Sequence, residues 1–103
     1  MEKQGKITIG ICDDHDVFVR LIYSMVNSFC EKRSVSAKIV TFSSGEEVIP
    51  FSKELDVLFL DIEMPGMDGI KVADELRKFN QYMHIIFISN TNEYKLNILT
   101  KRL

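Results

Sequence analysis

The stretch "DVLFLDIEMPGMDG", residues 56–69, carries the strongest structural signal in the chain. A mostly apolar run leads directly to Asp61, and an acidic turn containing Pro65 and Gly66 follows it. Short apolar runs bounded by turn residues are typical of strands buried on both faces. Asp68 before Gly69 then predicts the N-cap of a helix. The stretch therefore predicts a strand over 56–61 that ends on a carboxylate, then a tight turn and a helix.

Strands and helices alternate along the rest of the chain. The apolar and β-branched patterns predict strands over 6–12, 35–42, 56–61 and 84–89. Helical spacing of apolar residues predicts helices over 17–32, 69–79 and 92–103, and a short one near 44–50. This β-α-β-α-β-α-β-α order predicts an α/β domain with a parallel sheet covered on both faces.

Local signals place the ends of these helices. Asp14 is the expected N-cap of the first helix. Ser44 and Glu47 have capping-box spacing, which starts the short second helix. Pro50 lies too deep for a first turn, so the second helix should end or bend there. The last helix should place Leu96, Leu99 and Leu103 on one side.

Composition narrows the class of protein. The 103 residues are 46% hydrophobic and 27% charged with a net charge of −2, which predicts one small globular domain over 1–103. No run rich in lysine and arginine favours direct binding to nucleic acid or to a membrane. The N-terminus is too polar for a secretory signal, so Cys12 and Cys30 are expected to be reduced thiols in the cytoplasm.

Polar side chains stand at the ends of three predicted strands. Asp13 and Asp14 follow the first, Asp61 ends the third, and Ser89 ends the fourth. The carboxyl ends of parallel strands form the usual ligand site of an open α/β sheet. Clustered carboxylates repel one another unless one is protonated or a cation is bound, and Mg²⁺ prefers such oxygen ligands. A carboxylate can also attack phosphorus and form an aspartyl phosphate.

Three motifs together resemble a known family. "ICDDHD" (11–16), "LFLDIEMPGMDG" (58–69) and "IIFISN" (85–90) are similar to the receiver domain of two-component response regulators. The resemblance implies that Asp61 is the phosphoacceptor. It implies that Asp13 and Asp14, with Asp61 and the backbone carbonyl of Glu63, hold Mg²⁺. It also implies that Ser89 hydrogen-bonds the phosphoryl group and takes part in the switch.

The same resemblance implies the function and the partners. The fold would be flavodoxin-like, a three-layer α/β/α arrangement. A sensor histidine kinase would supply the phosphoryl group, in phosphorelay signal transduction. The domain would be a signalling module, not an enzyme in the usual sense, although it would catalyse its own phosphoryl transfer and dephosphorylation. An output domain beyond the C-terminus would respond, and "NEY" (92–94) resembles receivers joined to LytTR DNA-binding domains that regulate transcription.

The chain departs from the family pattern at its C-terminal end. Receivers carry a fifth strand and helix, with a lysine at the end of that strand. Lys95 and Lys101 fall in the predicted last helix, so neither can take that place. We therefore expect a receiver truncated to about four strands and four helices, and a fragment of a longer regulator. An exposed edge on strand four would then favour a homodimer or a domain swap.

Other readings of the same residues stay open. A receiver-like interaction module would keep the fold without being switched by phosphate. An aspartate-nucleophile phosphohydrolase of the haloacid dehalogenase type also starts from an Asp after a strand, but Met64-Pro65 stands where that family has Gly-Thr. Asp61 could also be an ordinary turn residue. We expect His15 and His84 to be neither metal ligands nor phosphorelay residues.

Overall fold

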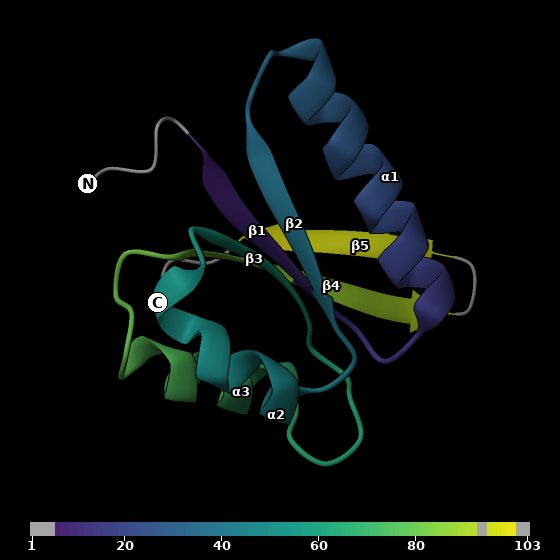
Figure 1. Cartoon of the computed structure of the whole chain (residues 1–103). Coiled ribbons are helices and arrows are strands. Elements are labelled where there is room, and N and C mark those ends of the chain that lie inside the picture. The colour runs from purple at the N-terminus through teal and green to yellow at the C-terminus, as the bar shows by residue number, and fades with distance from the viewer. Residues whose placement is uncertain (1–5, 93–94, 101–103) are drawn as a thin grey trace.

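The computed structural model describes residues 6–92 and 95–100, and the side chains of residues 6–89. A five-stranded sheet with the order β2-β1-β3-β4-β5 forms the centre. Its strands are β1 (Ile7–Cys12), β2 (Ala37–Phe42), β3 (Val57–Asp61), β4 (His84–Asn92) and β5 (Lys95–Thr100). The helices are α1 (Asp16–Lys32), α2 (Gly45–Val48), α3 (Gly69–Arg77) and a 3-10 helix, η1 (Ile49–Glu54). Figure 1 shows α1 on one face of the sheet and α2 and α3 on the other, which confirms the three-layer α/β/α fold.

The first four strands in the sheet order are parallel. β1 pairs with β2 on one side and with β3 on the other, and β3 pairs with β4. The register places Cys12 opposite Leu60, and Asp61 opposite Ile88. The carboxyl ends of β1, β3 and β4 therefore meet at one edge of the sheet, as the sequence predicts.

Two apolar cores lie on the two faces of the sheet. The larger packs Leu58 and Leu60 of β3 against Val72 and Leu76 of α3. The smaller packs Ile11, Ile22 and Ile88 under α1, with Phe59 of β3 against them. Because successive strand residues point to opposite faces, an apolar run such as 57–60 supplies both cores. This is why that run does not alternate with polar residues.

The apolar side of α1 is only partly covered. Met25 and Phe29 are 51% and 55% exposed. They line a groove of about 410 Å³ together with residues of β1 and β3, among them Ile9 and Phe59. α1 is the one helix on this face in the described part of the chain, so it cannot shield all of the apolar surface that the face presents.

The predicted helix ends are right at two of three places. Asp68 caps α3 by accepting a hydrogen bond from the amide of Lys71 at 3.0 Å. Ser44 caps α2 in the same way, with the amide of Glu47 at 3.3 Å. Asp14 is not the N-cap of α1, because the helix begins at Asp16 and His15 takes the capping position without a side-chain cap.

α2 ends just before Pro50, as predicted. The α-helix ends at Val48, and the chain continues as the 3-10 helix η1 with Pro50 in its first turn. A proline in the first turn of a helix removes only an N–H that would be unpaired in any case.

The predicted helix over 92–103 is wrong. Residues Lys95–Thr100 form β5, which pairs antiparallel with β4, and Ile98 stands opposite Ile88. The ladder is irregular between Ser89 and Asn92. Pairing satisfies the backbone groups that β4 would otherwise expose, and this overrides the helical spacing of the leucines.

The same pairing removes the basis for the predicted dimer. β5 pairs with β4 from Ile86 to Asn92, so in the described part of the chain this stretch of β4 is not an open edge for a homodimer or a swap. Lys95 begins β5 instead of lying in a helix, while Lys101 and Leu103 lie outside the described residues. No helix in the described part of the chain is long and apolar enough to cross a membrane.

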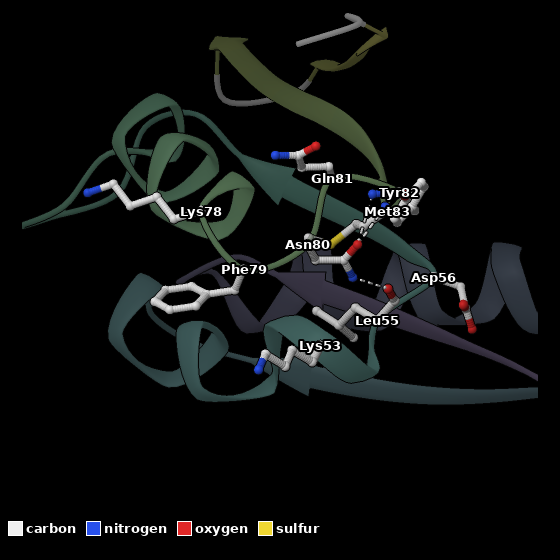
Figure 2. A pocket seen from close by; sticks show the side chains of 9 residues that line it. All are labelled: Lys53, Leu55, Asp56, Lys78, Phe79, Asn80, Gln81, Tyr82 and Met83. Carbon is white, nitrogen blue, oxygen red and sulfur yellow. Dashed lines mark hydrogen bonds between the residues drawn. The ribbon is translucent and has the colours of Figure 1, made fainter.

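A network of hydrogen bonds around Asn80 lies at the end of the sheet where β3 and β4 begin (Figure 2). The side-chain nitrogen of Asn80, Nδ2, donates to the carbonyl oxygens of Ser52 and Leu55 at 2.8 and 3.0 Å. Its side-chain oxygen accepts from the amides of Tyr82 and Met83 at 2.9 and 3.0 Å. One side chain thus joins the segment that enters β3 to the segment that enters β4.

Candidate functional site

Four polar side chains gather at the carboxyl edge of the sheet. Asp13 follows β1 and Asp61 ends the neighbouring β3, and both are 1% exposed. Asp14 and His15 follow Asp13 in the loop before α1. The four residues each offer a ligand atom, and these atoms all lie within 4.8 Å of one another. The sequence predicted this meeting of Asp13, Asp14 and Asp61, but not the part of His15.

Each buried carboxylate keeps one oxygen without a partner. Asp13 Oδ1 accepts from the amide of His15 at 2.9 Å, and Asp61 Oδ1 accepts from the amide of Glu63 at 3.2 Å. Asp13 Oδ2 and Asp61 Oδ2 are buried and have no hydrogen-bond partner among the described residues. Leaving such oxygens unpaired is costly, so their presence indicates a site made for an external partner.

The electrostatics of the cluster favour a cation. Burial, and then the negative charge of Asp13, raise the pKa of Asp61 from 3.8 to about 7, while the hydrogen bond from the Glu63 amide lowers it. A cation between the carboxylates would remove both the repulsion and the need for a proton. Apart from the imidazole of His15, the donor atoms of the cluster are hard carboxylate oxygens. These oxygens are ligands that fit Mg²⁺.

The turn after Asp61 is shaped by two glycines. Gly66 has a φ of +80°, a left-handed conformation that glycine adopts without steric cost. A Cβ on Gly69 would overlap the carbonyl oxygen of Asp61 and come within 2.8 Å of the Cα of Ile62. The amide of Gly69 also donates to the carbonyl of Ile62 at 2.8 Å. The start of α3 is thereby fixed directly against the end of β3.

Cys12 directly precedes Asp13 and is part of the larger core. It is 0% exposed, and its Sγ donates to the carbonyl of Ser44 at 3.4 Å. Burial, followed by the charges of Asp13 and Asp61, raises the pKa of the Cys12 thiol to about 12. The thiol is therefore not ionised near neutral pH, which excludes it as a nucleophile. Both cysteines are free and buried, as expected.

The other two predicted site residues, Glu63 and Ser89, lie near the carboxylates but make different contacts. Glu63 has an exposed side chain, and its backbone amide orients Asp61. Ser89 lies on β4, one position beyond Ile88, the residue that pairs with Asp61. Ser89 is partly buried, and its hydroxyl makes no hydrogen bond to Asp13, Asp14 or Asp61. Ser89 therefore lies near the carboxyl edge of the sheet, but it makes no hydrogen bond to the three carboxylates.

His15 also lies in the cluster, although the sequence favours no ligand role for it. Its Nδ1 lies 3.3 Å from Asp13 Oδ1 and 3.2 Å from Asp14 Oδ1. The charge of Asp14, and then the hydrogen bond with Asp13, raise the pKa of His15. Its position directly after two aspartates was the one signal available in the sequence.

Comparison with known proteins places this arrangement in a family. Residues 9–101 match the family described as response regulator receiver domain. The chain belongs to this family. The receiver domain is a signalling module. This chain shows its flavodoxin-like α/β fold, with four parallel strands and helices on both faces of the sheet.

Curated relatives contain the receiver domain as one part of a longer protein. A protein-glutamate methylesterase/protein-glutamine glutaminase from Halalkalibacterium halodurans is 34% identical over 99 residues, covering 94% of this chain and 28% of that protein. The nitrate/nitrite response regulator protein NarL from Escherichia coli is 29% identical over 94 residues, covering 89% of this chain and 42% of that protein. This receiver domain thus spans less than half the length of these relatives.

Solved structures agree on the fold. The CheX-CheY complex with BeF3 and Mg from Borrelia burgdorferi gives a TM-score of 0.68 at 25% identity, covering 85% of this chain and 65% of that one. A response regulator receiver domain protein from Clostridium thermocellum gives a TM-score of 0.68 at 21% identity, covering 81% of this chain and 64% of that one.

Proposed function

We propose that this receiver domain accepts a phosphoryl group on Asp61 from a sensor histidine kinase, with Mg²⁺ as cofactor. One observation carries the proposal: Asp61 Oδ2 is buried at the carboxyl edge of the sheet and has no hydrogen-bond partner among the described residues. An oxygen without a hydrogen-bond partner keeps its lone pairs for a bond to phosphorus.

The residues around Asp61 prepare it for this reaction. The Glu63 amide holds Oδ1 at 3.2 Å, which leaves Oδ2 as the nucleophilic oxygen. As Oδ2 forms its bond to phosphorus, the bond from phosphorus to the donor breaks and its electron pair leaves with the donor. The product is an acyl phosphate on Asp61. The close approach of Gly69 to the backbone carbonyl of Asp61 fixes the backbone that carries this carboxylate.

The metal ligands of the proposal are Asp13, Asp14, Asp61 and the backbone carbonyl of Glu63. The unpartnered Oδ2 atom of Asp13 supports the first of these, and Asp14 and Asp61 offer ligand atoms to the same cluster. A bound Mg²⁺ would neutralise negative charge on the phosphoryl oxygens. Ser89 would donate a hydrogen bond to one of those oxygens, and its place beside the end of β3 supports this role.

The consequences of phosphorylation belong to the same proposal. The reaction takes place in the cytoplasm, and the phosphorylated domain changes its affinity for an output domain or another partner. Relatives such as NarL are response regulators in which the matched region is a minor part of the chain, which supports an output domain elsewhere in the protein. A LytTR-type DNA-binding output that regulates transcription remains the interpretation that "NEY" favours.

Phosphorylation is tested by incubating the protein with acetyl phosphate and Mg²⁺ and measuring the mass of the intact chain. We expect one phosphoryl adduct that hydroxylamine removes. Asp61→Asn should abolish it. The matched control is Asp68→Asn, which alters the nearby carboxylate that caps α3 and should retain the adduct.

The other outcomes separate the alternative functions. No adduct on a folded protein that binds Mg²⁺ would overturn the proposal in favour of an interaction module that is not switched by phosphate. Repeated turnover of phosphate esters that depends on Asp61 would instead identify a phosphohydrolase.

A further inference from the structure

His15 extends the carboxylate cluster with a different kind of donor atom. Its Nδ1 lies 3.3 Å from Asp13 Oδ1 and 3.2 Å from Asp14 Oδ1. Asp13, Asp14, His15 and Asp61 together have their ligand atoms within 4.8 Å of one another. The imidazole is thus placed inside the group of oxygens to which the proposed function assigns a metal.

These spacings, which here are those of a hydrogen bond and an ion pair, also match those of ligands that share one ion. Two neighbouring ligands in an octahedral shell with bonds of about 2.1 Å are separated by about 3.0 Å. The distances from the imidazole to the two carboxylate oxygens are close to this separation. The buried Oδ2 atoms of Asp13 and Asp61, which have no hydrogen-bond partner among the described residues, are an independent sign that an external ligand completes the cluster.

The ring is also held in position from its other side. His15 packs edge-on against Phe18 with ring centroids 5.8 Å apart, and its backbone amide donates to Asp13 Oδ1 at 2.9 Å. These two contacts limit both the backbone and the ring of His15. A ligand that is already oriented loses less conformational entropy on binding.

We propose that His15 supplies a ring nitrogen to the ion held by Asp13, Asp14 and Asp61, and thereby makes this site select Mn²⁺ and Co²⁺ over Mg²⁺. The inference rests on the proposed metal site and adds the identity of the preferred ion. In this arrangement the neutral ring binds through Nδ1 and keeps its proton on Nε2.

The selectivity follows from the chemistry of the donor atoms. Mg²⁺ prefers oxygen ligands and gives up water reluctantly, so an imidazole adds little to its binding. Later divalent ions of the first transition row bind imidazole strongly, with affinity rising from Mn²⁺ to Co²⁺. A site of carboxylates alone would lack the nitrogen contribution. His15 therefore accounts for the additional affinity for these ions.

The test measures binding of each ion directly by calorimetry on the full chain. His15→Ala should weaken Co²⁺ binding at least about tenfold and Mn²⁺ binding less, and should change Mg²⁺ binding by less than about threefold. The matched control is His84→Ala, which removes the other histidine and should leave all three affinities unchanged. Pulsed EPR of the Mn²⁺ form should show coupling to a nitrogen nucleus that disappears in His15→Ala.

Each possible result decides a different point. The His15 side chain is 58% exposed, so its replacement should leave the fold intact, and circular dichroism checks this. Equal Co²⁺ affinity in wild type and His15→Ala, with normal Mg²⁺ binding, would overturn the role of His15 and leave the proposed function standing. An equal loss for Mg²⁺ and Co²⁺ would also overturn it. No binding of any ion to the wild type would overturn the proposed metal site as well.

Discussion

Gly69 lies so close to the carbonyl oxygen of Asp61 that a side chain at position 69 would overlap it. We expect Gly69→Ala to destabilise the fold by about 1 to 3 kcal/mol, because the first turn of α3 must move away from β3. Urea unfolding measures the change. Lys71→Ala, an exposed position in the same turn, should have an effect below about 0.5 kcal/mol. Equal stability of Gly69→Ala and wild type would show that the two elements are not in contact.

The buried charge of Asp61 predicts a pH dependence. Its folded-state pKa is raised from 3.8 to about 7, so the folded protein holds more protons than the unfolded chain between these values. Stability should therefore fall as pH rises through this range, by about 1 to 4 kcal/mol in metal-free buffer. Asp61→Asn should be more stable than wild type at pH 8 and similar near pH 4. Thermal melts in the presence of a chelator test this, and a destabilised Asp61→Asn at pH 8 would contradict it.

Mg²⁺ should reverse that destabilisation. A ligand that binds only the folded state at one hundred times its dissociation constant contributes about 2.7 kcal/mol. We expect saturating Mg²⁺ to raise the melting temperature of the wild type at pH 8. Asp13→Asn and Asp61→Asn should respond much less, since each removes one of the buried carboxylates. A similar Mg²⁺ response in all three proteins would place the ion elsewhere.

The four hydrogen bonds of Asn80 predict a stability effect far from the carboxylates. Asn80→Ala leaves two carbonyls and two amides without this partner, and we expect a loss of about 2 to 4 kcal/mol. The neighbouring Gln81→Ala, at an exposed position next to Asn80, should change stability by less than about 0.5 kcal/mol. Chemical denaturation separates the two. At temperatures where Asn80→Ala is folded, its phosphoryl uptake should equal that of the wild type.

β5 predicts what a shorter chain would do. A chain ending at Asn92 would expose the backbone groups of β4 that pair with β5 in the full protein. Open strand edges promote association between chains, so this variant should form larger species in light scattering. A chain ending at Thr100 retains the whole of β5 and serves as the control. If both variants scatter alike, β5 does not protect the edge.

The last segment shows where local pattern and tertiary pairing disagree. Leucines at 96, 99 and 103 have helical spacing, but Leu96, Ile98 and Thr100 also alternate as in a strand. Periodicity alone cannot choose between the two over so few residues. The neighbouring edge of β4 decides, and a single sequence does not reveal which edge is open. The strands over 57–61 and 84–89 posed no such conflict, because their apolar runs are short and lie between turn residues.

The site was predictable where chain direction determines position. Asp13 follows β1 and Asp61 ends the neighbouring parallel β3, so they had to meet at one edge of the sheet. The orientation of a side chain in a loop has no such constraint. His15 turns its ring toward the aspartates because of its contacts with Asp13, Asp14 and Phe18. The sequence shows only that His15 follows the two aspartates, and this position alone does not predict a role for its side chain.

The burial of Cys12 has a consequence for the reaction of the protein with oxidants. Only a thiolate reacts readily with peroxides or alkylating agents, and a pKa of about 12 leaves almost none at neutral pH. Cys12, which is buried next to Asp13, should therefore remain unmodified. The phosphorylation proposed for Asp61 should therefore be insensitive to oxidants that act on thiols.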